Sequence, residues 1–159
     1  MDRTKSIDAL NNLISINNNR FESYAKASRQ TDESDLIMLF IEFQEKSKKC
    51  KTELVSEVHK LGGKPINDSS ISLPFMQVWI KIKSKFKSND REDILNRCEH
   101  DDDITIKTYK NVLSENSENL TEIQQNMLTA QHQSIKIDHD ILKDLGNVLV
   151  SCRKFTLDT

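Results

Sequence analysis

The chain has 159 residues, a formal net charge of −2, and charged residues of both signs that make up 30% of its composition. This length is typical of one domain with a core of its own, and the mixed charge gives no field that would gather DNA or RNA. Only three glycines and two prolines interrupt a sequence rich in helix-forming residues. The composition therefore favours an all-α protein without a nucleic-acid partner.

The cysteines and the N-terminal segment bear on where the protein is found. Cys50, Cys98 and Cys152 form no close pair in the sequence, and each falls on an apolar helical face, as reduced core cysteines do. The first twelve residues lack the apolar core of a signal peptide, and no run approaches the ~20 apolar residues of a membrane span. We expect a cytoplasmic protein that neither is exported nor crosses a membrane.

Apolar residues recur with a 3.6-residue period in four segments, which predicts four helices. The polar turn at 31–35 joins the first two helices and the polar connection at 115–119 joins the last two, so each pair should form an antiparallel hairpin. Thr4 or Ser6 is expected to cap the first helix, and Gly62-Gly63 to end the second. Residues 1–152 are predicted to form a single domain, followed by a frayed tail at 153–159. The predicted helices cover about residues 6–30, 35–61, 90–115 and 119–150.

Residues 64–89 form the connection between the two hairpins. Phe75, Trp79 and Phe86 share one helical face, which predicts a short amphipathic helix over 73–87. The run IKIKSKF also alternates at period two, so a strand is an alternative, and its lysines raise the alternative of an anionic membrane surface. We expect packing onto the bundle, with a crossover that runs the length of the bundle and makes the second and third helices parallel.

The third helix aims a carboxylate at the core. At 100° per residue, Asp102 falls on the same stripe as Leu95, Cys98 and Tyr109, with Glu99 at the edge of the stripe. A buried carboxylate without a partner costs several kcal/mol or becomes protonated. Asp102 therefore needs polar partners from other helices.

Residue counts along the four helices indicate where those partners lie. Measured from the 31–35 turn, polar side chains on the inward faces of all four helices come to similar heights in the bundle. We predict a hydrogen-bonded interior layer that fixes the register of the helices. Its predicted members are Asn17, Tyr24, Ser47, Asp102, Gln131 and Ser134.

A metal centre is the alternative interpretation, because carboxylates in bundle cores bind the ions of di-iron proteins. The chain contains no Glu-x-x-His motif, and all four histidines project to the flank or solvent side of their helices. Asp101 and Asp103 are expected to be solvated, since residues 100° apart cannot all face the core. No catalytic or cofactor-binding residue is predicted. The remaining candidates for a divalent ion such as iron, manganese or zinc are Glu99 and Asp102.

Four stretches carry a family resemblance: LNNLISINNNRFESYAKA, LFIEFQEKSKKCKTELVSEVHKLGG, ILNRCEHDDDITIKTYKNVL and QHQSIKIDHDILKDL. They resemble the helices of a bacterial group within the ferritin-like superfamily that is known only as a domain of unknown function. The resemblance implies a ferritin-like four-helix bundle, near stress-associated and iron-storage proteins by fold alone. It carries no established activity. It limits any residual metal site to Glu99 and Asp102, with His139 as a neighbouring group.

Two hypotheses of different classes follow. In the first, the chain is a non-enzymatic bundle that acts by association, as a homo-oligomer or with a protein partner, or in a stress-related role. In the second, it is a degenerate ferritin-like protein that binds a divalent ion through Glu99 and Asp102. Replacing Asp102 with Leu is expected to be neutral or stabilising in the first case. In the second case the same change should abolish any stabilisation by metal.

Overall fold

The computed structural model describes residues 1–67 and 90–157, with side chains as far as residue 148. Within these ranges the chain is helical and contains no strand, so the all-α prediction is confirmed. The predicted amphipathic helix at 73–87 lies outside the described residues. None of the described helices combines the length and the apolar composition that a bilayer crossing requires. The elements are α1 (Arg3–Gln30), α2 (Ser34–Lys60), α4 (Arg91–Glu115), the 3-10 helix η1 (Ser117–Asn119) and α5 (Glu122–Leu157).

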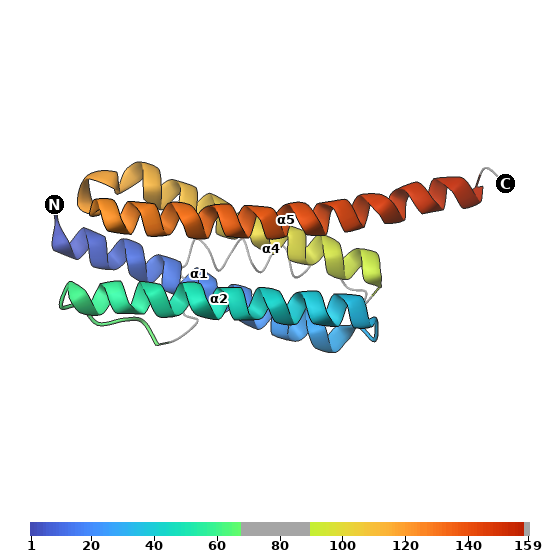
Figure 1. Cartoon of the computed structure of the whole chain (residues 1–159), viewed down its shortest axis with the longest axis horizontal. Coiled ribbons are helices and arrows are strands. Elements are labelled where there is room, and N and C mark those ends of the chain that lie inside the picture. Colours follow the sequence, from blue (N-terminus) through green and yellow to red (C-terminus); the bar gives the residue numbers. More distant parts are fainter. Residues whose placement is uncertain (68–89, 158–159) are drawn as a thin grey trace.

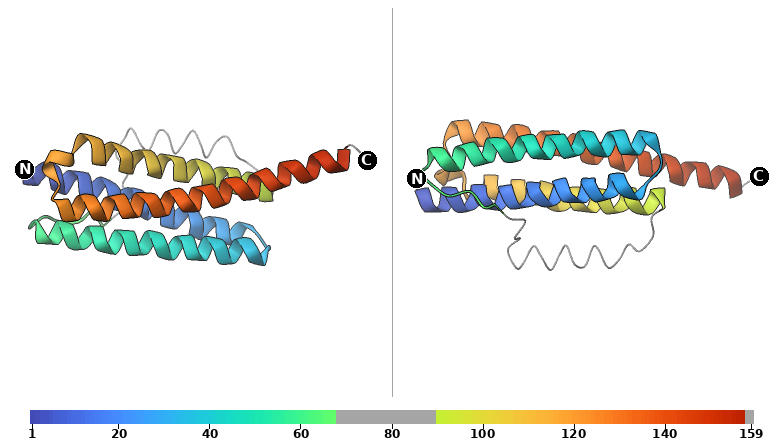
Figure 2. Two further views of the ribbon diagram at one scale, coloured as in Figure 1. Left: turned by 45° about the horizontal axis from the view of Figure 1, so that its top comes forward. Right: turned by 90° about the horizontal axis from the view of Figure 1, so that it is seen from below.

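The helices form a bundle of two antiparallel hairpins, α1–α2 and α4–α5, which lie side by side (Figures 1 and 2). As predicted, α2 and α4 run in the same direction (Figure 1). The hairpins pack on each other mainly through α1 and α4, whereas α2 and α5 approach each other at few points. One long edge of the bundle is therefore more open than the others.

The helix ends differ from the predictions in ways that their capping residues explain. Asp2 caps α1 in place of Thr4 or Ser6, because its Oδ1 accepts hydrogen bonds from the backbone N–H groups of Thr4 (3.0 Å) and Lys5 (3.3 Å). The N-terminus of α5 lies at residue 122 and not 119. There Thr121 and Gln124 form a capping box, in which each side chain accepts a hydrogen bond from the other's backbone N–H at 3.1–3.2 Å.

The C-terminal ends of α2 and α5 differ in whether a glycine stops the helix. Gly62 adopts φ = 74° directly after α2, and the Gly63 N–H donates to the Val58 carbonyl at 2.9 Å, which closes the helix as the LGG sequence predicts. At the other end of the chain α5 continues to Leu157, past the predicted end at residue 150 and into the segment predicted to fray. The helix continues because no proline or glycine follows Gly146 to stop it.

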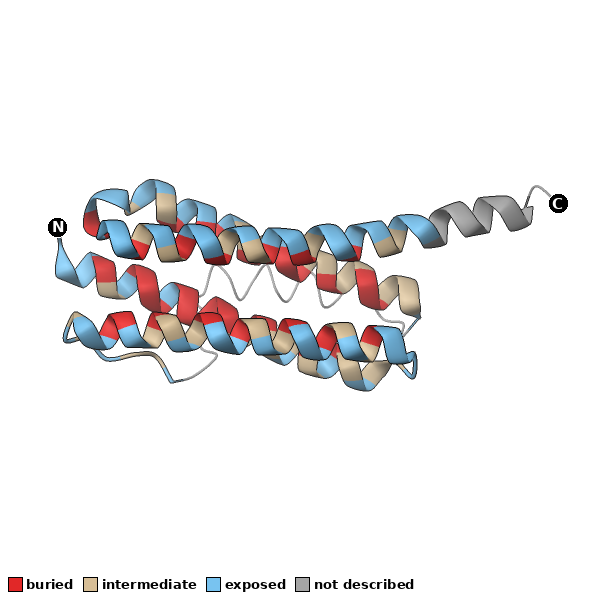
Figure 3. Cartoon of the chain, in the orientation of Figure 1, coloured by how far each residue is buried: buried red, intermediate tan, exposed pale blue. Residues whose placement is uncertain are grey.

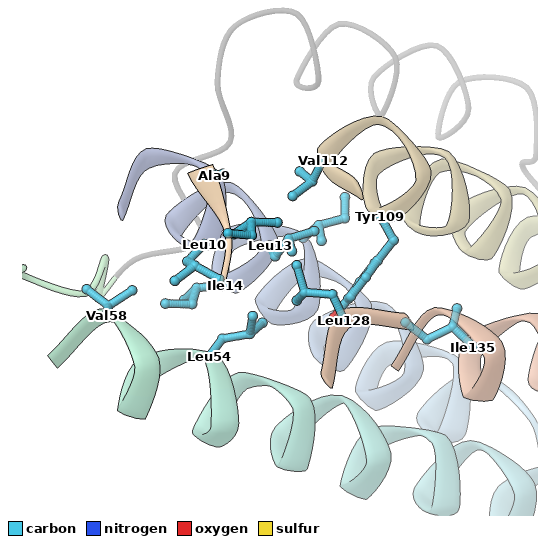
Figure 4. Close-up of a cluster of buried hydrophobic side chains, with 12 residues drawn as sticks. Ala9, Leu10, Leu13, Ile14, Leu54, Val58, Tyr109, Val112, Leu128 and Ile135 are labelled. Carbon is cyan, nitrogen blue, oxygen red and sulfur yellow. The ribbon is translucent and has the colours of Figure 1, made fainter. Parts of the chain in front are cut away.

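Buried residues form a stripe along the inner face of each helix (Figure 3). They gather in two apolar clusters. One contains Leu10, Leu13, Leu54, Tyr109 and Leu128 and their neighbours (Figure 4), and lies toward the end of the bundle at which α2 terminates. The other lies toward the α1–α2 turn and is built from Tyr24, Leu36, Phe40, Phe43, Ile94, Leu95, Cys98 and Leu142. Polar side chains separate the two clusters.

Candidate functional site

The centre of the bundle is occupied by the guanidinium group of Arg20, whose side chain is fully buried. Its Nε donates to Oδ1 of Asp102 on α4 at 2.8 Å, and its Nη2 lies 3.4 Å from Oδ2 of the same carboxylate. Nη2 also donates to Oδ2 of Asp138 on α5 at 2.9 Å. One buried cation from α1 thus bridges two buried anions from two other helices.

The fourth helix completes the coordination of Arg20. Nη1 donates to the Ser47 hydroxyl at 2.9 Å and lies 3.4 Å from the Phe43 carbonyl, both on α2. The five N–H groups of the guanidinium therefore face five acceptors. The aromatic rings of Tyr24 and Phe43 lie 5.0 and 5.7 Å from the guanidinium carbon, within the range of cation–π attraction.

Both carboxylates have a second donor. The Tyr24 hydroxyl donates to Oδ2 of Asp102 at 2.7 Å, and Lys46 Nζ donates to Oδ1 of Asp138 at 2.6 Å from a position that is one-third exposed. Two cations and two anions give this group no net charge. We refer to Arg20, Tyr24, Lys46, Ser47, Asp102 and Asp138 as the charged layer.

The environment of the charged layer shifts several pKa values. Burial acts to lower the pKa of Arg20, but the attraction of Asp102 and Asp138 outweighs it, and the pKa lies well above its usual value. Burial, with the nearby Asp102 carboxylate, raises the pKa of Tyr24 well above 10. Burial also raises the pKa of Asp138, although Lys46 and Arg20 oppose this shift. Arg20 and Tyr24 therefore remain protonated at neutral pH.

A second polar group lies about one helical turn away and contains no buried ion. The Asn17 Nδ2 donates to the Tyr109 hydroxyl at 2.7 Å, and that hydroxyl donates to the Gln131 Oε1 at 2.8 Å. The Gln131 Nε2 then donates to a carboxylate oxygen of Glu53 at the edge of the bundle, at 2.7 Å. We refer to Asn17, Tyr109 and Gln131 as the uncharged layer. It links α1, α4 and α5, and reaches α2 through Glu53.

The position of Arg20 follows from the spacing of inward residues on α1. Asn17 and Tyr24 both face the interior, and Arg20 lies three residues after one and four before the other. Steps of three and four residues keep side chains on one face of a helix. Phe21, one position away from this stripe, is only half-buried.

The structure places most of the predicted layer residues inside, but not in one layer. Tyr24, Ser47 and Asp102 belong to the charged layer, whereas Asn17 and Gln131 belong to the uncharged layer. Ser134 is half-buried and lines a groove between α2 and α5. Arg20 and Asp138 were not among the predicted members of the layer. The signal for both was a charged residue on an otherwise inward stripe.

The acidic run of α4 also differs from expectation. Asp103 is exposed as predicted, but Asp101 is 5% exposed, so the prediction that it is solvated is wrong. The reason is that α4 packs on α1 as well as on α5. Ile94, Asp101 and Thr108 form a row on α4 next to its core stripe. This row faces α1 and is therefore buried.

The three candidate metal ligands do not come together. Asp102 faces the interior and bonds to Arg20 and Tyr24, whereas Glu99 lies near His139 on the outer side of the α4–α5 contact, with 3.7 Å between Oε1 and Nε2. The same His139 nitrogen lies 2.8 Å from Oδ1 of the exposed Asp103. Among the described residues, no group of three or more His, Cys, Asp or Glu side chains is arranged to hold a metal ion.

The cysteines in the described core are inert thiols. Cys50 and Cys98 are buried and free of disulfides, as expected for core cysteines. Burial raises the pKa of Cys50 to about 11 and that of Cys98 well above its usual value. Both thiols are therefore protonated and poorly nucleophilic at neutral pH.

Comparisons with known proteins agree with this architecture. The model of a family described as a domain of unknown function, DUF2383, matches residues 5–115. The chain belongs to this family. The structure of the DUF2383 chain is similar to that of a dodecameric thioferritin, a bacterioferritin-related protein from Bacteroides fragilis, with a TM-score of 0.67 and 16% sequence identity. The similarity covers 99% of this chain and 92% of the other, so the predicted ferritin-like four-helix bundle is confirmed. A comparison with curated proteins gives no match.

The ferritin-like fold raises the question of whether the interior fits a di-iron centre. Such centres take carboxylate and histidine ligands from all four helices of the bundle. In this DUF2383 chain α1 and α2 direct Arg20 and Ser47 into the interior, and the guanidinium already engages the carboxylates of Asp102 and Asp138. A cation at this position repels metal ions and uses the oxygens that would bind them. The residues of the charged layer do not fit a di-iron centre.

Proposed function

We propose that this protein is a non-enzymatic ferritin-like bundle that acts by association, with a buried ion-pair layer in place of a di-iron site. The observation that carries the proposal is the fully buried Arg20 and its contacts to Asp102 and Asp138. The guanidinium supplies the positive charge that a metal ion supplies in a di-iron bundle. It also occupies the carboxylate oxygens of Asp102 and Asp138 that would otherwise bind the ions.

Association is supported by the fold and by the surface. The thioferritin to which the fold is similar is described as dodecameric, and its fold therefore presents faces that pack against further copies. In the present chain, exposed large apolar side chains recur along α5, at Ile123, Ile137, Ile141 and Val148. Exposed apolar side chains that gather on one part of a surface favour protein contacts. A stress-related role would be carried by such assembly and not by redox chemistry.

The proposal is tested by metal content and iron oxidation. Protein purified without chelator should contain no stoichiometric iron, manganese or zinc by elemental analysis. Adding the same ions should leave the melting temperature unchanged, because a ligand that binds only the folded state raises it. Ferrous iron should oxidise in air at the same rate with and without the protein. Stoichiometric metal in the interior or catalysed oxidation would contradict the proposal and favour the metal-binding alternative.

Two variants locate any metal that is found. Asp102→Asn changes the carboxylate that pairs with Arg20, and His139→Gln changes the outer cluster with Glu99 and Asp103. Loss of metal in Asp102→Asn alone would assign it to the interior and reject the proposal. Loss in His139→Gln alone would assign it to the surface of the α4–α5 hairpin, where it would not involve the charged layer.

A further inference from the structure

The open edge of the bundle contains a groove between α2 and α5. The two helices touch at few points, and the salt bridge from Lys46 to Asp138 and the hydrogen bond from Gln131 to Glu53 connect them. The groove has a volume of about 370 Å³. Its walls combine apolar and charged side chains: Lys46, Lys49, Cys50, Glu53, Met127, Ala130, Gln131 and Ser134.

Helix α5 carries a second stripe in addition to its core-facing one. The stripe advances by alternate steps of four and three residues, which is the spacing of a helix that packs along another helix. Four of its members are exposed large apolar residues: Ile123 (74%), Ile137 (59%), Ile141 (37%) and Val148 (59%). Three others line the groove, so the stripe faces it. In order, the stripe reads Ile123, Met127, Ala130, Ser134, Ile137, Ile141, Asp144 and Val148.

We propose that this stripe, together with the groove, is the contact surface for a second copy of the chain. The α5 helices of the two copies run antiparallel and come closest at Ile137. The contact is isologous, so the same surface serves both copies. It rests on the proposed function, in which the chain acts by association, and it names the partner and the surface.

The size of this surface matches what a stable dimer requires. Residues 123 to 148 span ~38 Å of helix at 1.5 Å per residue, and two adjacent helices present a face ~20 Å wide. The footprint is therefore on the order of 750 Å² per copy, close to the ~800 Å² per partner that stable complexes bury. The apolar residues of the stripe supply the hydrophobic centre of such an interface.

Charge complementarity favours a second copy over an unrelated helix. Asp144 is exposed and interrupts the apolar stripe seven residues after Ile137. In an antiparallel pair centred on Ile137, it lies opposite Ala130 of the second copy, which is seven residues before the centre. Ala130 shares its groove with Lys46, Lys49 and Glu53, of which Lys46 is paired with Asp138 and Glu53 with Gln131. Each Asp144 thus meets Lys49 of the other copy, and symmetry makes the contact occur twice.

The first test is the mass of the full chain in solution, measured by light scattering and sedimentation. The wild type is expected to be a dimer or an assembly of dimers. Ile137→Glu should raise the dissociation constant of the assembly at least tenfold and so shift the protein to smaller species. The matched control is Ile41→Glu, on a side chain of similar exposure (48%). Ile41 lies on the solvent side of α2, about 140° around the helix from Lys46 and about 80° from Lys49. It should leave the assembly unchanged, and circular dichroism should show both variants folded.

The second test is charge reversal. Asp144→Lys should weaken the assembly about tenfold, and adding Lys49→Asp should restore it. A monomeric wild type, equal effects of Ile137→Glu and Ile41→Glu, or no rescue by Lys49→Asp would overturn the proposal. The metal measurements are independent of these results. A monomer without iron chemistry would reject only this contact surface, whereas a dimer that oxidises iron would reject the metal-free interior.

Discussion

The charged and uncharged layers occupy the same interior, about one helical turn apart, but they depend on different energies. In the charged layer, Arg20 and two aspartates are stable only as a complete set, because any buried ion left without its partner keeps the full cost of desolvation. In the uncharged layer, Asn17, Tyr109 and Gln131 exchange hydrogen bonds that are each worth about 1 kcal/mol. The first layer should therefore respond to single substitutions as a unit, and the second residue by residue.

The largest effect is expected for Arg20→Met. This variant leaves Asp102 without its cationic partner and Asp138 with Lys46 alone, and breaking a buried ion pair from one side costs about 3–5 kcal/mol. The free energy of unfolding, from urea denaturation at neutral pH, should fall by that amount. A decrease below about 1 kcal/mol would show that Arg20 is not held as the structure describes.

The companion to this variant is the combined replacement Arg20→Met, Asp102→Leu and Asp138→Leu. Removing all three buried ions together should recover most of the lost stability, because apolar residues of similar volume can replace a buried ionic set. Asp102→Leu alone should now be strongly destabilising, since it leaves Arg20 with one fewer carboxylate. This expectation replaces the one drawn from the sequence, that the change is neutral or stabilising, because that one assumed a carboxylate without a buried cation.

A somewhat smaller effect is expected at alkaline pH. The chain has two tyrosines, Tyr24 and Tyr109, and burial raises the pKa of both well above 10. The folded state then binds more protons than the unfolded state above pH 10, so stability falls as the pH rises past that value. Each tyrosine contributes ~1.4 kcal/mol per pH unit, or ~3 kcal/mol together at pH 11.

Ultraviolet absorbance of tyrosinate measures this directly. Because both tyrosines are buried, the native protein should show no tyrosinate signal until it unfolds. Urea denaturation at pH 8, 10 and 11 gives the accompanying loss of stability. The buried thiols of Cys50 and Cys98 add to this loss because their pKa values are raised as well, so Tyr109→Phe should reduce the slope without abolishing it. A tyrosinate signal near pH 10 in a folded protein would contradict the burial of these hydroxyls.

The fold could be predicted from the sequence because its signals are local. The 3.6-residue period, the polar turn at 31–35 and the LGG sequence each act within a few residues, and together they fix two antiparallel hairpins. The predicted positions of the helix ends were less accurate, because residues near Asp2 and Thr121 are also of types that cap helices. The crossover length sufficed to predict that α2 and α4 are parallel.

The candidate site was predicted only in part, for a different reason. Arginine is seldom fully buried, so its residue type argues against an interior position for Arg20, although its spacing from Asn17 and Tyr24 places it there. Without Arg20, a buried Asp102 had to be satisfied by neutral groups or by a metal. Asp102 and Asp138 lie 82 and 118 residues after Arg20 along the chain, and only packing brings them together.

The smallest effects compare the two layers through the same substitution, tyrosine to phenylalanine. Tyr24→Phe removes a hydrogen bond to the ionised Asp102, and such bonds are worth about 1.5–3 kcal/mol. Tyr109→Phe removes bonds to two neutral amides, and Asn17 Nδ2 retains the Leu13 carbonyl at 2.8 Å, so a loss of about 1 kcal/mol is expected. Both rings are fully buried and keep their apolar contacts, which makes the difference in unfolding free energy a measure of the hydroxyl alone. Equal losses in the two variants would mean that the charge of Asp102 does not strengthen its hydrogen bond with Tyr24. The two layers would then not differ in the way their contacts indicate.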